Sequence, residues 1–219
     1  MCADCHSTNV SKGYRPGDDI YETTWSEIDV SCEACHGAGS EHVAWAAKGA
    51  DANLVGLGLD VDLRSEGEWR FEPERPIAHR VPPIASETQI ETCAPCHARR
   101  SSIAPHDSGG RFLDSYRPAL LDQGLYHADG QILDEVYVWG SFLQSRMQAA
   151  GVVCSDCHDP HRLRIDEPDA VCASCHRSEA FATPAHHHHA ADSAGASCVS
   201  CHMPARTYMV VDSRRDHSF

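Results

Sequence analysis

The pattern Cys-x-x-Cys-His occurs six times in this chain of 219 residues and uses all 12 of its cysteines. A histidine follows the second cysteine in every copy, whereas only ten further histidines are spread over the rest of the sequence. Such regularity is no accident of composition, so we treat each copy as one chemical unit. Motifs 1 to 6, in chain order, are Cys2-Cys5-His6, Cys32-Cys35-His36, Cys93-Cys96-His97, Cys154-Cys157-His158, Cys172-Cys175-His176 and Cys198-Cys201-His202.

Three chemistries use paired cysteines, and the histidine separates them. Residues 154–176 hold two Cys-x-x-Cys pairs 14 residues apart, close to the spacing of a zinc ribbon. Neither zinc nor a disulfide needs a histidine directly after the second cysteine. A c-type haem does, because the two thiols bond its vinyl groups and the next residue turns its imidazole onto the iron. The motifs therefore predict six haem c groups held by the 12 cysteines, with zinc and disulfides as alternatives. The proximal iron ligands are then His6, His36, His97, His158, His176 and His202.

The composition points to a core that the polypeptide does not provide. Leu, Ile, Val and Phe make up only 38 of the 219 residues, and the formal net charge is -14. This combination is typical of disordered chains. Six large apolar macrocycles would complete the core, so we expect haem-free protein to be largely unfolded.

The expected fold is mainly α-helical, with much irregular coil, a small β-hairpin and the haems as the core of a multihaem cytochrome c architecture. We expect one domain over residues 1–219, with 50–85 as a loop insertion because that stretch lacks cysteine and is rich in Gly, Pro and acids. Helices are predicted from the N-cap Ser40 to Gly49, from a capping box of Ser86 and Gln89 into motif 3, and over 142–150. A hairpin is predicted around Asp129-Gly130.

Each iron has a sixth position, and the histidines outside the motifs are candidates for it. An ordinary surface histidine is the alternative for every one of them. His79 is a weaker candidate than the others. Within the run of four histidines at 186–189 at most one or two face a given haem, because neighbouring residues on a helix point about 100° apart. The candidates that we retain are His42, His106, His127, His161, His187 as representative of the run, and His217. Methionine is rarer, at four residues, so we expect mostly bis-His ligation and low potentials.

The charge balance bears on location and partners. The acidic net charge argues against nucleic acid as a partner. The 16 arginines, against two lysines, suit pairing with haem propionates, although a GC-rich genome explains them equally well. No apolar run approaches 18 residues, so no membrane span is expected. Covalent haem is attached outside the cytoplasm, so we expect a periplasmic or otherwise extracytoplasmic protein. Because the chain opens "MCADCH" without a signal peptide, we interpret it as a piece of a longer protein.

Several stretches resemble a known group, the multihaem c-type cytochrome region of bacterial proteins that also carry tetratricopeptide repeats. The stretches are "MCADCHSTN", "VSCEACHGAGSEHVAWA", "ETCAPCHARR", "YHADGQILDEVYVWGSFLQSRM", "GVVCSDCHDPH" and "CVSCHMPARTYMVVDSRRDHSF". The resemblance implies a further haem motif upstream and helical repeats downstream. Wider relatives include pentahaem nitrite reductase and hydroxylamine oxidoreductase. Their "CHMP" pattern with a later histidine implies that His217 is a distal ligand.

Two functions are compatible with these features. The first is electron transfer through closely spaced haems to redox partner proteins, with every iron six-coordinate. The second is an oxidoreductase in which one five-coordinate haem binds a small nitrogen or sulfur oxyanion. Polar groups available for such a site are Tyr126, His127, Gln131 and Arg146, whose alternative role is ordinary surface. The uniformity of the six motifs favours electron transfer.

Overall fold

The computed structural model describes residues 2–49, 55–65, 67–84, 86–162, 165, 167–208 and 210–219. The chain divides into two compact units, which we treat separately. Unit 1 comprises Met1–Leu63 and Glu91–Pro118, and unit 2 comprises Arg64–Ile90 and Ala119–Phe219. Motifs 1 to 3 lie in unit 1 and motifs 4 to 6 in unit 2. The expectation of a single domain stays a prediction.

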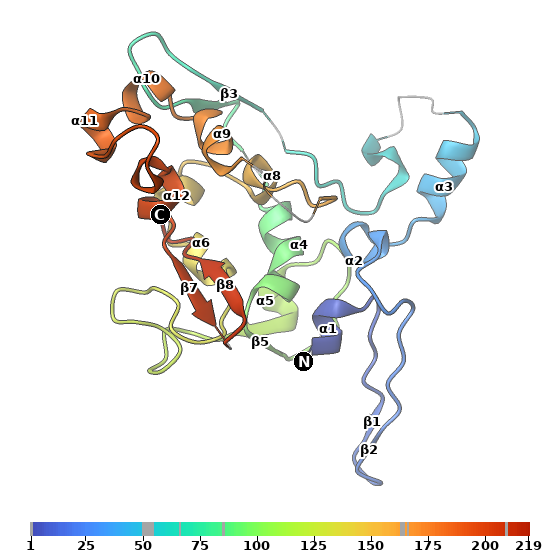
Figure 1. Ribbon diagram of the computed structural model, residues 1–219. Coiled ribbons are helices and arrows are strands. Elements are labelled where there is room, and N and C mark those ends of the chain that lie inside the picture. Colours follow the sequence, from blue (N-terminus) through green and yellow to red (C-terminus); the bar gives the residue numbers. More distant parts are fainter. Residues whose placement is uncertain are drawn as a thin grey trace. The chain divides into compact units, whose positions relative to one another are not determined.

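Unit 1 consists of short helices and two small antiparallel sheets, β1–β2 and β5–β6 (Figure 1). Its elements are α1 (Cys2–His6), β1 (Tyr14–Arg15), β2 (Ile20–Tyr21), α2 (Cys32–His36), α3 (Ser40–Ala47), the 3-10 helix η1 (Val55–Gly58), most of α4 (Thr88–His97), β5 (Arg100–Ser102), α5 (Phe112–Ser115) and β6 (Tyr116–Pro118).

Unit 2 also consists of short helices and two small antiparallel sheets, β3–β4 and β7–β8. Its elements are β3 (Glu68–Arg70), β4 (His79–Val81), the start of α4, α6 (Trp139–Phe142), α7 (Arg146–Ala149), α8 (Cys154–Cys157), α9 (Pro168–Ala173), α10 (Ser178–Phe181), α11 (Pro184–His187), the 3-10 helix η2 (Ala194–Ala196), α12 (Cys198–His202), β7 (Ala205–Tyr208) and β8 (Asp212–Arg215). Among the described residues no helix is long and apolar enough to span a membrane.

Two of the three predicted helices are present. Helix α3 begins after the N-cap Gly39, one residue before the predicted cap, and ends at Ala47. Helix α4 runs into motif 3 as predicted. Just before it, the Ser86 hydroxyl accepts a hydrogen bond from the Thr88 N–H at 3.1 Å. The side-chain amide of Gln89 bonds Ser155.

The prediction of one helix over 142–150 was wrong. Ser145 has an extended backbone, and its hydroxyl accepts the N–H of Gln148 at 3.1 Å. That hydrogen bond caps a new helix, so the segment forms α6 and α7 instead.

The hairpin predicted around Asp129-Gly130 is present in short form. The Gly130 N–H bonds the carbonyl of His127 at 3.0 Å, which makes the turn. On its flanks the His127 N–H bonds the Gln131 carbonyl at 2.8 Å, and Tyr126 and Ile132 form an antiparallel bridge. The four named strand pairs lie elsewhere in the described chain.

The interval 50–85 is not structureless in its described part. It contains η1 and the β3–β4 ladder, in which Trp69 is paired with Arg80. Residues 50–54, 66 and 85 lie outside the described residues. Its role as an insertion stays a prediction.

The polypeptide has a thin core. Among the described residues 11 apolar side chains are buried, while 17 large apolar ones are exposed. The solvent-accessible surface is 14614 Å². One globular body of 23.9 kDa would expose about 10,000 Å², and two bodies that share this mass about 12,000 Å². The excess surface leaves room for additional apolar groups, as the composition predicts.

Candidate haem-attachment sites

The motifs sit on short helices that suit attachment to a planar group. Motifs 1, 2, 3, 4 and 6 lie on α1, α2, the end of α4, α8 and α12, respectively. Motif 5 begins in α9. One helical turn brings the two cysteines of a motif to the same side. None of the 12 cysteines forms a disulfide, and none is buried: Cys2, Cys32 and Cys201 are exposed and the others half-buried. Over the described positions no three His, Cys, Asp or Glu side chains converge as a zinc site requires.

In unit 1, Arg100 joins motif 1 to motif 3. Its Nε donates to the carbonyl of Pro95, inside motif 3, at 2.8 Å, and its guanidinium lies 3.6 Å from the Asp4 carboxylate, inside motif 1. The same guanidinium lies 4.2 Å from the ring centroid of Tyr116. Its side chain is 8% exposed. Arg100 thus fixes the two motifs side by side.

The thiols of these two motifs touch. Cys5 Sγ lies 3.8 Å from the Pro95 carbonyl, and its hydrogen bond with Cys96 lowers the pKa of Cys5 to about 6. The same bond, together with burial, raises the pKa of Cys96. Any groups bonded to these two sulfurs would be direct neighbours.

In unit 2, motif 4 is held by a buried ion pair. The Arg80 guanidinium hydrogen-bonds the carboxylate of Asp156, and their side chains are 2% and 11% exposed. Trp69 Nε1 donates to Asp156 at 3.1 Å, and Arg80 Nε donates to the Gly151 carbonyl at 3.1 Å. Because the partners satisfy one another, both charges are tolerated in the interior.

Motifs 5 and 6 are held through backbone groups. The Ala78 N–H bonds the Cys175 carbonyl at 2.8 Å, which ties motif 5 to the segment that carries Arg80. Asp169, in α9, accepts the N–H of Cys198 at 3.1 Å and so links motif 6 to the helix of motif 5. Arg215 donates to the Val199 carbonyl within motif 6 at 3.2 Å.

Burial favours the uncharged forms of two thiols and two imidazoles in the motifs of unit 2. It raises the pKa of Cys157 and the pKa of Cys198 to about 11. It also lowers the pKa of His158 and the pKa of His176. Neutral imidazole is the form that binds a metal. The Cys172 thiol also shares a hydrogen bond with Cys198, so motifs 5 and 6 touch as motifs 1 and 3 do.

Three histidines hold the tautomer that an iron ligand needs. The Nδ1 of His36, His42 and His217 lies 3.0, 2.8 and 2.9 Å from a backbone carbonyl oxygen, respectively. A carbonyl only accepts, so Nδ1 carries the hydrogen and Nε2 keeps its lone pair. This second contact is typical of metal-bound histidine.

Two histidine pairs have the spacing of imidazoles on opposite sides of one metal. The ring centroids of His158 and His217 are 6.2 Å apart, and those of His202 and His186 are 6.0 Å apart. Two imidazoles that bind one ion through Nε2 at about 2.0–2.1 Å have centroids about 6.3–6.5 Å apart. Each pair joins a motif histidine to one outside the motifs, and the two ring planes differ by 20° and 7°, a spacing compatible with one iron between them.

The remaining candidates differ in availability. His106 packs against Tyr116 with ring centroids 5.2 Å apart; its Nδ1 is buried without a hydrogen bond, and burial lowers its pKa. His127 Nε2 accepts a hydrogen bond from Arg206 at 2.6 Å, which occupies the lone pair that iron would need.

The other two candidates are exposed or hold the opposite tautomer. The side chain of His161 is 78% exposed, 3.7 Å from Asp159. His187 Nδ1 accepts the His189 N–H at 3.2 Å, so its hydrogen sits on Nε2. His186, rather than His187, is the member of the run that faces a motif histidine. Met1 and Met209 lie outside the described residues.

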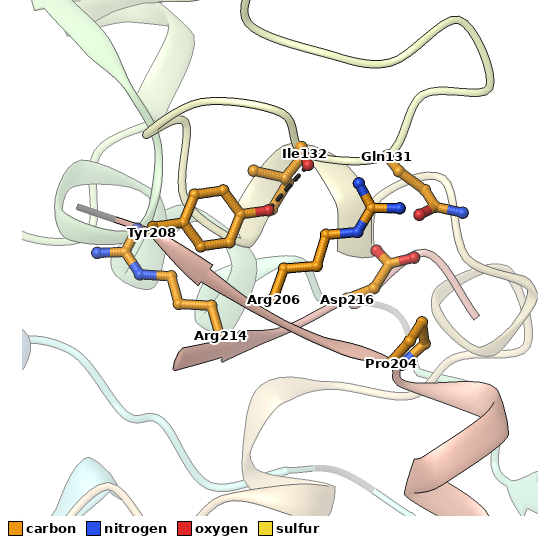
Figure 2. Close-up of a pocket in the computed structure, with 7 residues that line it drawn as sticks. All are labelled: Gln131, Ile132, Pro204, Arg206, Tyr208, Arg214 and Asp216. Carbon is orange, nitrogen blue, oxygen red and sulfur yellow. Dashed lines mark hydrogen bonds between the residues drawn. The ribbon is translucent and has the colours of Figure 1, made fainter. Parts of the chain in front are cut away.

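A small polar pocket in unit 2 includes one of the residues considered for oxyanion binding (Figure 2). It is lined by Gln131, Ile132, Pro204, Arg206, Tyr208, Arg214 and Asp216. The Tyr208 hydroxyl closes one side by donating to the Ile132 carbonyl at 2.8 Å. The cavity volume is about 10 Å³, the space of a single water. Tyr126 and Arg146 do not line it.

Sequence reasoning missed the residues that hold the motifs together. Arg80, Arg100 and Arg215 each bond an atom between the two cysteines of a motif. The signal was present, because acids stand inside motif 1 and motif 4 and arginine greatly outnumbers lysine. The sequence pattern suggested haem propionates as partners of the arginines, with a GC-rich genome as an equal alternative, but not the motifs themselves.

Comparison with known proteins identifies the fold. No protein-family model and no curated protein matches the chain. Its structure is similar to the crystal structure of the outer cell wall cytochrome OcwA, with a TM-score of 0.58 at 16% sequence identity. The match covers 100% of this chain and 55% of that cytochrome, so the chain spans about half the length of its neighbour. The chain has the fold of a multihaem cytochrome, mainly helix and coil with small antiparallel sheets. The link to tetratricopeptide-repeat proteins stays a prediction.

Proposed function

We propose that this protein transfers electrons through six covalently bound haem c groups. The observation that carries the proposal is the pairing of histidine rings. His217 and His186 lie 6.2 and 6.0 Å from the rings of His158 and His202, as axial ligands of one iron do. A haem iron, once bound, cycles between ferric and ferrous and carries one electron.

Six haems follow from six equivalent motifs. All 12 cysteines are outside disulfides and at least partly accessible, and every motif starts on a helix. The likeness to a multihaem cytochrome supports the kind of cofactor, and the motif count supplies the number.

We infer mostly bis-His ligation and hence low potentials. His217 and His186 would serve the irons of motifs 4 and 6. His42, which has the required tautomer, and the buried His106 would serve unit 1. His127, His161 and His187 remain sequence candidates with less structural support.

The contacts between motifs suggest the route of electrons. Cys5 touches Cys96 in unit 1, and Cys172 touches Cys198 in unit 2. Haems bonded at these sulfurs would be adjacent, which favours hopping within each unit. Redox partner proteins at an extracytoplasmic location complete the proposal, together with a further haem upstream and helical repeats downstream in a longer protein.

One observation favours a second function, an oxidoreductase with one open iron. Unit 1 contains three motif histidines but only two others, His42 and His106. Its own residues therefore leave one iron without a histidine. A five-coordinate iron there would bind a small nitrogen or sulfur oxyanion.

Mass spectrometry and electron paramagnetic resonance of the holoprotein test the proposal. We expect six haems in the denatured protein. The variants His217→Ala and His186→Ala should each convert one low-spin iron to high spin, whereas His187→Gln and His161→Gln should change nothing. Retained zinc without haem mass, or an unchanged spectrum in both alanine variants, would contradict the proposal.

A further inference from the structure

Residues 11–30 of unit 1 form an arm on which every residue is exposed. The arm contains β1 and β2 and lies between motif 1 and motif 2 in the sequence. Figure 1 shows it extending away from α1 and α2. No other hairpin among the described residues is exposed over such a length.

The arm is an ordered hairpin held by backbone pairing and by hydrogen bonds at its root. Its backbones pair at Ser11 with Thr24 and at Tyr14 with Tyr21. At its root Thr8 is 1% exposed and donates its hydroxyl to the Asp29 carbonyl at 2.7 Å. The Ser31 N–H donates to the same hydroxyl at 2.9 Å, directly before Cys32 of motif 2. An ordered structure so fully exposed needs an explanation.

The exposed face is apolar and aromatic. Tyr14 and Tyr21 lie with ring centroids 4.7 Å apart, yet they are 46% and 64% exposed. Ile20, Trp25 and Ile28 are also exposed at other points along the arm. A two-stranded hairpin alone is marginally stable in water, and clustered exposed aromatics mark interaction sites.

The tip of the arm lies at the end of its ladder that faces away from the motifs. The ladder runs from the Thr8–Glu27 bridge through Ser11–Thr24 to Tyr14–Tyr21, while motif 1 precedes its root and motif 2 follows it. Lys12, part-way along the arm, reaches Asp4 of motif 1 at 3.2 Å. A group that covers the tip would therefore come from outside this chain.

The charge of the arm indicates whether a second copy of this chain or a different protein covers the tip. The arm carries five acids and two bases, within a chain of net charge -14. A second copy would bring like charges together, whereas a basic protein would be attracted. The charged residues of the arm are Lys12, Arg15, Asp18, Asp19, Glu22, Glu27 and Asp29.

We infer that the arm is the docking element for a basic redox protein with an apolar contact face. The inference rests on the proposed electron-transfer function. The arm would hold its partner beside motifs 1 and 2, whose first cysteines, Cys2 and Cys32, are exposed. Each encounter moves one electron: one ferrous haem of this protein becomes ferric, and one ferric haem of the partner becomes ferrous.

Titration calorimetry at low salt tests the docking. The probe is a lysine-rich, basic monohaem cytochrome c, added to oxidised holoprotein. The variant Tyr14→Ser/Tyr21→Ser/Trp25→Ser should weaken binding about tenfold or more. The matched control is Val210→Ser/Val211→Ser, at the β7–β8 turn of unit 2, where both side chains are more than 80% exposed: 91% and 86%. This control variant should bind the basic cytochrome as tightly as the wild type does.

A second variant tests the charge argument. Asp18→Asn/Asp19→Asn/Glu22→Gln should weaken binding and flatten its salt dependence. Haem content and reduction by dithionite confirm that each variant is intact. Stopped-flow mixing with reduced holoprotein then reads electron transfer to the probe, with ferricyanide as a small acceptor that needs no docking.

Binding that is unchanged in the aromatic variant would overturn the inference. So would a dimer that this variant dissociates in light scattering while the wild type ignores the basic probe, because the occupant would then be a second copy. A protein that binds the probe through the arm but passes it no electron would support docking and contradict the proposed function.

Discussion

The two units carry the same number of motifs but differ in the histidines around them. Unit 1 has two histidines outside its motifs, His42 and His106, for three motif histidines. Unit 2 has eight for three. A count over the whole chain conceals this difference. If each unit ligates its irons with its own histidines, the first iron to lack one belongs to unit 1.

The units also fix their motifs by different means. Unit 1 uses Arg100, whose carboxylate partner Asp4 also contacts Lys12 at 3.2 Å. Unit 2 uses Arg80 with Asp156, a nearly fully buried pair. In both, an arginine reaches into the space between the two cysteines. The loss of a single partner should therefore be felt most in unit 2.

The largest expected effect comes from withholding haem, which should abolish both units. The core of the polypeptide is too thin to stand alone, so haem-free protein should give the far-UV circular dichroism of a mostly disordered chain. Limited proteolysis should cut both units equally. A cooperative thermal transition of the haem-free protein would contradict the prediction that both units need haem to fold. Resistance of one unit to proteolysis would show that the two units differ in this need.

The next effect is on the stability of the holoprotein. Arg80→Leu leaves Asp156 buried without its partner, which costs about 3–5 kcal/mol. Arg100→Leu should cost less, because Asp4 keeps Lys12. Thermal unfolding of both variants measures the difference.

The double variant Arg80→Leu/Asp156→Leu is the control for this prediction. It removes both charges and should recover most of the loss. If Arg100→Leu proved the more destabilising single change, our account of the two units would be reversed.

A third prediction concerns one iron out of six. Because unit 1 has two spare histidines for three irons, we expect reduced protein to bind one equivalent of carbon monoxide. His42→Ala should raise this to two, read as a shift of the Soret band. His161→Gln in unit 2, where histidines are plentiful, should leave it at one. If wild-type protein binds none, a ligand from outside unit 1 completes the third iron.

The sequence predicts the chemistry from local spacing and leaves much of the chain path open. The motifs predict the cofactor and its proximal ligands because covalent attachment requires fixed spacing along the chain. The structure adds which histidine outside the motifs faces which motif, and that depends on tertiary contacts. His186 could not be separated from His187 by spacing, since only their surroundings differ.

Local signals predicted one of two short elements and missed the other. The turn residues Asp129-Gly130 predict a reversal of the chain, and one is present with Tyr126 and Ile132 bridged across it. The helical pattern of 142–150 is interrupted by Ser145, a residue that caps helices as readily as it continues them. In a chain where few apolar side chains are buried, such local preferences win more often than in an ordinary core.

The smallest effect tests that corrected cap. Ser145 is 2% exposed, and its hydroxyl accepts the N–H of Gln148 in the first turn of α7, so Ser145→Ala should cost about 1 kcal/mol. Ser40→Ala in unit 1 is the matched control, because Ser40 lies inside α3 after the N-cap Gly39 and is exposed. Its midpoint of thermal unfolding should equal that of the wild type. A loss at Ser40 equal to that at Ser145 would mean that both serines are caps and that α3 begins where the sequence pattern placed it.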